Sequence, residues 1–273
     1  MTDALPELKT AAGISYRESG GRDSPALVLL HGIGSTSAGW RLQFGPLGRS
    51  FRVIAWDAPG YGHSTPLAGE APEPETYARA LAGLLDALGV GKALIGSNSW
   101  GTPTAITFAR LYPARATALV LGGPTAGLGG LAPEERDQRV RDRTERIRNL
   151  GPDRMRQEDA GRLVAPGASA ELLGWIRSAS GVTVEGYSQA ARMMGRIDCV
   201  RDIAALDCPI VVVSGEKDIV TPPEANSKRL AAAAKRGTLE MIPDCGHLPH
   251  LEFPERFNAA VMRASAARIA VAG

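Results

Sequence analysis

Cysteine and excess charge of either sign are both scarce in this chain of 273 residues. The three cysteines, Cys199, Cys208 and Cys245, are odd in number, and their spacing matches no metal site and no CxxC pair. We therefore expect reduced thiols in a cytoplasmic protein without a metal or cofactor. The 31 basic and 29 acidic residues leave a net charge of +2, which gives no reason to expect a nucleic-acid partner.

Long apolar runs are missing as well. No stretch approaches the ~20 residues that a membrane-spanning helix needs, so no membrane association is expected. Residues 1–6 show no basic segment followed by an apolar one, and no secretion signal is predicted. Hydrophobic residues nonetheless make up 44% of the sequence, enough for one large core with a smaller appended subdomain.

Short apolar runs alternate with helical patterns over most of the chain. Gly13 predicts a turn between two short antiparallel strands at the start. Further strands are predicted at 26–30, 51–56, 92–96, 118–122, 209–213 and 239–242. Helices are predicted between them, including one at 223–236. This alternation implies right-handed crossovers and a mostly parallel, doubly wound α/β sheet.

The composition changes between about Thr125 and Leu206, where apolar strands give way to arginine-rich helical sequence. The stretch 134–148 mixes both charge signs at helical spacing, which is typical of a solvated helix. We expect residues 125–206 to form a helical insertion within one core domain, which would comprise residues 1–124 and 207–273.

Ser99 lies where the strand at 92–96 runs through small residues into a helix at 102–111. The local sequence, Ser97-Asn98-Ser99-Trp100-Gly101, departs from the G-x-S-x-G nucleophile elbow only at Ser97, which is small. A serine that merely caps the next helix is the structural alternative.

Asp218 and His247 also follow predicted strands, and the carboxyl ends of parallel strands are where ligands bind. A serine needs a histidine to take its proton, and the histidine needs a carboxylate to fix its tautomer. The order Ser99, Asp218, His247 is the one that α/β-hydrolases use. His250 is a rival for the histidine.

Five motifs in this order resemble those of the α/β-hydrolase fold over nearly the whole chain. They are His31-Gly32-Ile33-Gly34 with Trp40, 57–64, 97–101, Gly215-Glu216-Lys217-Asp218 with Pro222-Pro223, and Gly246-His247 followed by Glu252 and Pro254. The resemblance implies a mostly parallel eight-stranded sheet flanked by helices, with a cap, or lid, inserted after strand 6.

The resemblance also implies roles for individual residues. Ser99 would be the nucleophile, Asp218 the acid and His247 the base, and the backbone N–H groups of Ile33 and Trp100 would form the oxyanion hole. Candidate pocket residues are Trp40, Trp100, Trp175, Tyr187, Met193 and His250. His31 is expected to shape the oxyanion loop.

These residues favour a serine hydrolase that cleaves a small, apolar carboxylic ester or lactone through an acyl-enzyme. The alternative is hydrolysis of a carbon–carbon bond in a ring-cleavage product, which Asn98-Ser99 and the His31 loop resemble. Leu248 and Trp100 depart from that branch. A ligand receptor without turnover is a third hypothesis, because fold alone does not decide function. The sequence leaves open the natural substrate, any homo-oligomer and the roles of Arg192, Arg196 and His250.

Overall fold

The computed structural model describes residues 4–269, in which eight strands form one sheet. The order in space is β1-β2-β4-β3-β5-β6-β7-β8, and only β1 with β2 and β2 with β4 pair antiparallel. The strands are β1 (Leu8–Ala11), β2 (Ile14–Ser19), β3 (Ala26–Leu30), β4 (Arg52–Trp56), β5 (Ala93–Asn98), β6 (Ala116–Gly122), β7 (Ile210–Gly215) and β8 (Gly237–Ile242). The predicted eight-stranded, mostly parallel sheet is thus confirmed.

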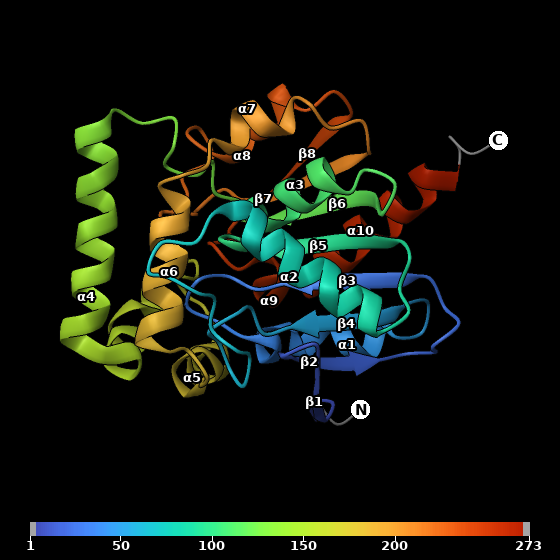
Figure 1. Cartoon of the computed structure of the whole chain (residues 1–273), viewed down its shortest axis with the longest axis horizontal. Helices are drawn as coiled ribbons and strands as arrows, with labels where there is room; N and C mark the ends of the chain where they lie inside the picture. Colours follow the sequence, from blue (N-terminus) through green and yellow to red (C-terminus); the bar gives the residue numbers. More distant parts are fainter. Residues whose placement is uncertain (1–3, 270–273) are drawn as a thin grey trace.

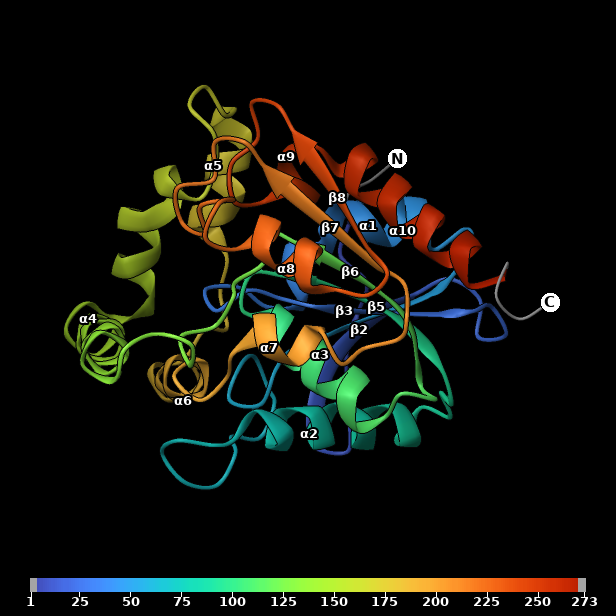
Figure 2. The same ribbon diagram turned by 90° about the horizontal axis from the view of Figure 1, so that it is seen from above.

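Helices cover both faces of this sheet, as Figures 1 and 2 show. One face carries α1 (Arg41–Leu47), α9 (Pro249–Glu252) and α10 (Pro254–Ile269), and the other carries α2 (Pro74–Ala87), α3 (Gly101–Leu111), α7 (Cys199–Ile203) and α8 (Ser227–Ala233). A 3₁₀ turn, η1 (Ser37–Trp40), precedes α1. The central strands are buried on both sides, which explains their continuous apolar runs.

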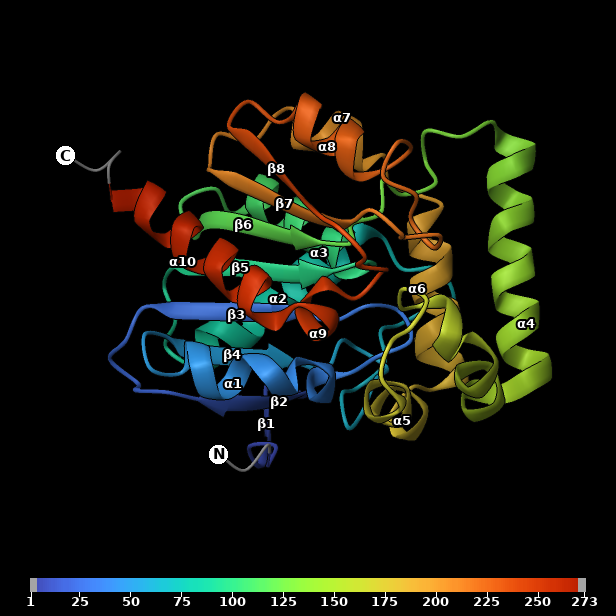
Figure 3. The same cartoon turned by 180° about the vertical axis from the view of Figure 1, so that it is seen from behind.

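The remaining helices lie beyond the carboxyl ends of the parallel strands, where β5 and β6 point in Figure 3. They are α4 (Pro133–Asp159), η2 (Ala160–Arg162), α5 (Ala170–Ser178) and α6 (Val184–Met194). We call these four elements, together with the loops that join them, the cap. Helix α6 lies between α4 and the sheet, and α4 breaks at Gly151, whose φ is 72° and which precedes Pro152. The charge-dense stretch 134–148 belongs to α4, most of whose side chains there are exposed or half-buried.

Two details differ from the predictions made from sequence. The helix predicted at 223–236 spans only Ser227–Ala233. It begins late because Asn226 has non-helical dihedral angles and its Oδ1 accepts a hydrogen bond from Ala126 N–H, and it ends early because Ala234 is extended. Helix α7 falls within residues 125–206 but packs on α3 and α8 of the core. The division at residues 125 and 206 therefore remains a proposal.

Candidate active site

Ser99 occupies a sharp turn between β5 and α3. Its φ is 51°, in the left-handed region that a residue with a side chain rarely adopts. Its N–H donates to the carbonyl oxygen of Gly122 on β6 at 2.9 Å, which fixes the turn against the sheet. A Cβ on Gly101 would lie 2.4 Å from the carbonyl oxygen of Leu30, so glycine is required there. These features are those of a nucleophile elbow.

Ser97 fits the elbow position that the motif gives to glycine. Its side chain is fully buried, and its Oγ has no hydrogen-bond partner among residues 4–269. The substitution is thus sterically tolerated, at the expense of a buried unpaired hydroxyl.

Asp218 and His247 come together just past the ends of β7 and β8. The Nδ1 of His247 lies 2.9 Å from the Oδ2 of Asp218, and both side chains are almost fully buried. When the N–H at Nδ1 donates a hydrogen bond to this carboxylate, Nε2 carries the free lone pair and is the basic site of the ring. His250, three residues away, lies against Trp40 instead, with ring centroids 4.4 Å apart.

Thr221 contacts both residues of this pair. Its Oγ1 lies 2.8 Å from Asp218 Oδ2, 3.1 Å from His247 Nδ1 and 3.1 Å from the carbonyl oxygen of Gly123. The N–H groups of Val220 and Thr221 donate to the other oxygen, Asp218 Oδ1, at 2.8 and 2.9 Å. The acid is therefore held at both oxygens.

The pKa of the Asp218 carboxyl lies below its ordinary value. Burial would raise this pKa, but the hydrogen bond and charge of His247, together with the Thr221 donors, outweigh burial. The carboxylate is thus ionised at neutral pH and can stabilise an imidazolium on His247.

The loop that carries Ile33 passes close to the nucleophile. A Cβ on Gly32 would lie 3.2 Å from the Oδ1 of Asn98 and 3.4 Å from the Cβ of Ser99, so this loop lies against the turn that carries the serine. The hydroxyl of Tyr61 donates to the carbonyl oxygen of Ile33 at 3.0 Å and holds the loop. Of the proposed oxyanion donors, Ile33 N–H belongs to this loop and Trp100 N–H belongs to the residue that follows Ser99 in the chain.

His31 supports this loop, and both of its ring nitrogens contact backbone groups of residues other than Asp218. Its Nε2 accepts from the N–H of Ala58 at 3.0 Å, and its Nδ1 lies 2.8 Å from the carbonyl oxygen of Gly32. Because Nε2 accepts, the proton resides on Nδ1. Complete burial lowers the pKa of His31, so the ring is neutral.

The six candidate pocket residues have different surroundings. Trp40, Trp100 and Met193 are almost wholly buried, and Tyr187 is 6% exposed. The indole Nε1 of Trp100 donates to the carbonyl oxygen of Ala190 on α6 at 3.1 Å, so this side chain joins the elbow to the cap. Trp40 packs against His250 and Phe257.

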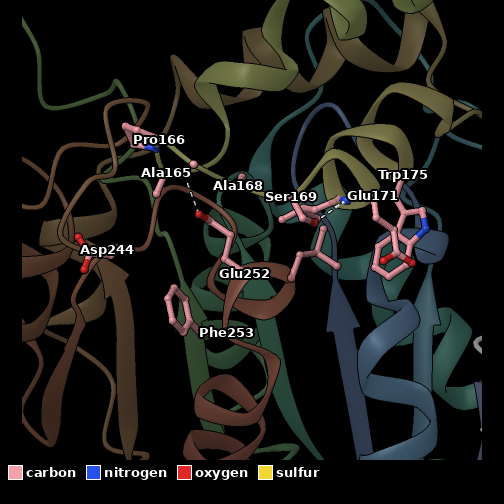
Figure 4. A pocket seen from close by; sticks show the side chains of 12 residues that line it. Ala165, Pro166, Ala168, Ser169, Glu171, Trp175, Asp244, Glu252 and Phe253 are labelled. Atoms are coloured by element: carbon pink, nitrogen blue, oxygen red, sulfur yellow. Dashed lines mark hydrogen bonds between the residues drawn. The ribbon is translucent and has the colours of Figure 1, made fainter.

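Trp175 lines a cavity of about 430 Å³ between the cap and the segment after His247 (Figure 4). None of the other five candidates lines this cavity, and neither does Ser99. The guanidinium of Arg41 lies over the Trp175 ring, 4.2 Å from its centroid.

The two cap arginines that could have recognised an acidic substrate are ion-paired. Arg192 contacts the carboxylate of Glu70 at 3.4 Å, and Arg196 pairs with Glu73. Both glutamates belong to the segment before α2, so these pairs join α6 and the residues that follow it to that segment.

Three contributions to the site were not assigned from the sequence. Thr221 follows Asp218 by three residues, a spacing typical of a carboxylate that accepts local N–H groups, and this could have been noticed. Asn98 donates through Nδ2 to the carbonyl oxygens of Gly122 and His247 at 3.0 and 3.1 Å. Glu252 receives backbone N–H groups from the His247 loop. The partners of Asn98 are 24 and 149 residues away and leave no local pattern, whereas Glu252 lies only four to six residues from its donors in the His247 loop.

Between residues 4 and 269 no cluster of His, Cys, Asp and Glu could hold a metal ion. Over the same residues, no helix combines the length and apolarity that a membrane crossing requires. The cytoplasmic location and the oligomeric state stay predictions.

Comparison with known proteins places this site in a family. The profile of the Alpha/beta hydrolase family matches residues 27–260. A 2-hydroxy-6-oxononadienedioate/2-hydroxy-6-oxononatrienedioate hydrolase from Burkholderia vietnamiensis is 29% identical over an alignment of 277 positions. The alignment covers 93% of this chain and 91% of the relative. A thermophilic esterase from Thermogutta terrifontis, solved with malate bound, is 31% identical.

The esterase structure superposes with a TM-score of 0.83 and covers 97% of this chain and 98% of its own. The enol-lactonase from Burkholderia xenovorans LB400 shares the fold at 22% identity, with a TM-score of 0.80 over 95% of this chain and 100% of that one. The family match, the eight-stranded sheet and the elbow at Ser99 agree. This chain belongs to the Alpha/beta hydrolase family.

Proposed function

We propose that the protein is a serine-dependent hydrolase in which Ser99 attacks a substrate carbonyl, His247 takes the serine proton and Asp218 stabilises the imidazolium. The observation that carries this proposal is the hydrogen bond of 2.9 Å between His247 and Asp218, near a serine held at positive φ. The N–H groups of Ile33 and Trp100 would stabilise the oxyanion.

The substrate class that we favour is a ring-cleavage product in which a carbon–carbon bond next to a ketone is hydrolysed. Support comes from the similarity to the 2-hydroxy-6-oxononadienedioate hydrolase, which extends over nearly the whole chain. This replaces the ester as the leading hypothesis from the sequence.

The chemistry of such a substrate is demanding. Cleavage of the tetrahedral adduct expels a carbanion, so a second carbonyl group must delocalise that charge as an enolate before a proton arrives. Water then releases the acyl group from Ser99 as a carboxylic acid. In total, one water is consumed, one C–C bond breaks, and the two fragments gain OH and H.

Ester or lactone hydrolysis is the second candidate. It requires the same attack on a carbonyl, but the leaving alkoxide needs only a proton from His247. Two observations favour it. The chain is 31% identical to an esterase. Arg192 and Arg196, which could have bound an acidic substrate, are instead paired with glutamates of this chain.

A pair of substrates with the same acyl group tests the choice. We expect 2-hydroxy-6-oxohepta-2,4-dienoate, which releases acetate, to show a kcat/KM at least ~100-fold above that of p-nitrophenyl acetate. The reverse preference would select the ester. Ser99→Ala should reduce both activities by more than ~1,000-fold without loss of folding, because the nucleophile is removed. Retained activity in this variant would contradict the proposed triad, and binding without turnover in the wild type would favour a receptor.

A further inference from the structure

Three consecutive backbone N–H groups, those of Gly246, His247 and Leu248, donate hydrogen bonds to only two residues, Glu252 and Leu163. The N–H groups of Gly246 and Leu248 donate to the carboxylate of Glu252 at 2.9 to 3.1 Å. The N–H of His247 donates to the carbonyl oxygen of Leu163 at 3.0 Å. Leu163 follows η2, so the backbone of the candidate base is bonded directly to the cap.

Glu252 also binds the cap. Its Oε2 accepts the N–H of Ala165 at 2.7 Å, drawn as a dashed line at the edge of the cavity in Figure 4. One carboxylate thus gathers N–H groups from the His247 loop and from the loop between η2 and α5. Hydrogen bonds to an ionised acceptor are roughly twice as strong as neutral ones.

Close packing reinforces these bonds. A Cβ on Gly246 would lie 2.6 Å from Ala165 N and from Val164 C, so the two backbones touch with no space for a side chain. Leu248 shares a small buried cluster with Val164, Leu172 and Ile176 of the cap. The residues on both sides of His247 are therefore packed on the part of the cap formed by η2 and α5.

We propose that Glu252 is a positioning residue that couples the η2–α5 part of the cap to His247, so that His247 is aligned with Ser99 only while this part is seated. The proposal rests on His247 being the general base of the proposed function. Glu252 itself touches no reacting atom. It acts by holding the peptide groups before and after the histidine.

Glu252→Gln is the direct test, because it keeps the shape but replaces one acceptor oxygen by an NH₂ that faces N–H donors. We expect phosphonylation of Ser99 by a fluorophosphonate to slow by at least about tenfold, as removal of an orienting partner does at other sites. This readout needs no knowledge of the natural substrate. Glu171→Gln is the matched control, since Glu171 lines the same cavity while the N–H groups of Gly246, His247 and Leu248 donate to Glu252 and Leu163. It should react within twofold of the wild-type rate.

A merely structural role would lower the melting temperature of Glu252→Gln yet leave the rate unchanged well below that temperature, and this result would overturn the proposal. The cap offers a second variant, at a residue outside the proposed triad. Leu172→Ala loosens the cluster around Leu248, so its effect on phosphonylation should be non-additive with that of Glu252→Gln. Additive effects would contradict the coupling.

Amide exchange in the wild-type protein tests the same idea if Glu252→Gln fails to fold. We expect the amides of Ala165, Gly246, His247 and Leu248 to open with one shared free energy, because they form one hydrogen-bonded unit. Separate opening of the cap amide and the His247 amides would overturn the proposal. Failure of the proposed function is distinguishable: there, Ser99→Ala would remain active or the wild type would not be phosphonylated.

Discussion

At the scale of single residues, the site depends on side chains that serve more than one partner. Thr221 approaches the acid, the histidine and a backbone carbonyl with one hydroxyl, while Asn98 binds two carbonyl oxygens beside the serine. Each such residue places two strand ends relative to one another. The triad is therefore held by polar contacts between loops as much as by the sheet.

Thr221→Val should change the pH dependence of the reaction. The Thr221 hydroxyl contributes to the lowered pKa of Asp218, so its loss leaves a more basic carboxylate that favours the imidazolium of His247. A base that protonates more readily becomes inactive at a higher pH. The acidic limb of the pH profile of kcat/KM should therefore move to higher pH. We also expect kcat to fall by roughly tenfold, the value of one hydrogen bond of about 1.4 kcal/mol.

Thr221→Ser is the control, because it keeps the hydroxyl and should restore both the rate and the position of the limb. A pH profile of Thr221→Val that matches the wild type would show that the hydroxyl has no influence on the acid–base pair.

At the scale of elements, α6 is fixed closely to the core. Gly186 of α6 contacts Gly60 so tightly that a Cβ on it would lie 2.3 Å from the carbonyl oxygen of Gly60. The side chain of Gln189 donates to the carbonyl oxygens of Leu67 and Gly69, and Trp100 donates to Ala190. This helix is therefore an anchored part of the cap.

Gly186→Ala should lower the free energy of unfolding by about 1–3 kcal/mol, because two backbones would have to separate. Gly174→Ala is a matched change in α5, where an added Cβ meets no atom within 4 Å. It should raise stability by about 0.5–1 kcal/mol through helix propensity. Urea unfolding curves measure both. Equal effects of the two variants would contradict the close contact with Gly60.

At the scale of the whole molecule, acid should destabilise the protein through buried neutral histidines. Burial lowers the pKa of His250 to about 3, from 6.5 in an exposed histidine, with a smaller contribution from His247. Between these values the unfolded chain binds the extra proton, so stability is full above pH 6.5 and declines as the pH falls. His31 acts in the same direction.

The expected loss attributable to His250 between pH 7 and pH 5 is about 2 kcal/mol. His250→Phe keeps a ring against Trp40 and Phe257 but cannot titrate, so its unfolding free energy should decline less over this interval by that amount. Urea unfolding at both pH values gives the comparison. Parallel declines in the two proteins would show that His250 titrates normally.

The fold was largely predictable because its signals are local. Apolar runs such as 26–30 mark buried strands, and a small-residue turn marks Ser99. The contacts of Glu252 with Ala165 and of Trp100 with Ala190 were not predictable, because they join segments about 90 residues apart without any periodic pattern. The late start of helix α8 has the same cause, since Asn226 bonds to Ala126.

The anchoring of α6 has an evolutionary consequence, because the indole of Trp100 bonds to a backbone carbonyl, whereas the contact with Gly60 depends on the absence of a side chain. A recombination event that imported residues 184–194 from a relative would supply a carbonyl at position 190 with any sequence, but it would also have to supply glycine at position 186. The segment around Gly60 and this helix should therefore be inherited together, whereas α4, which packs on α6, α5 and η2, can diverge more freely.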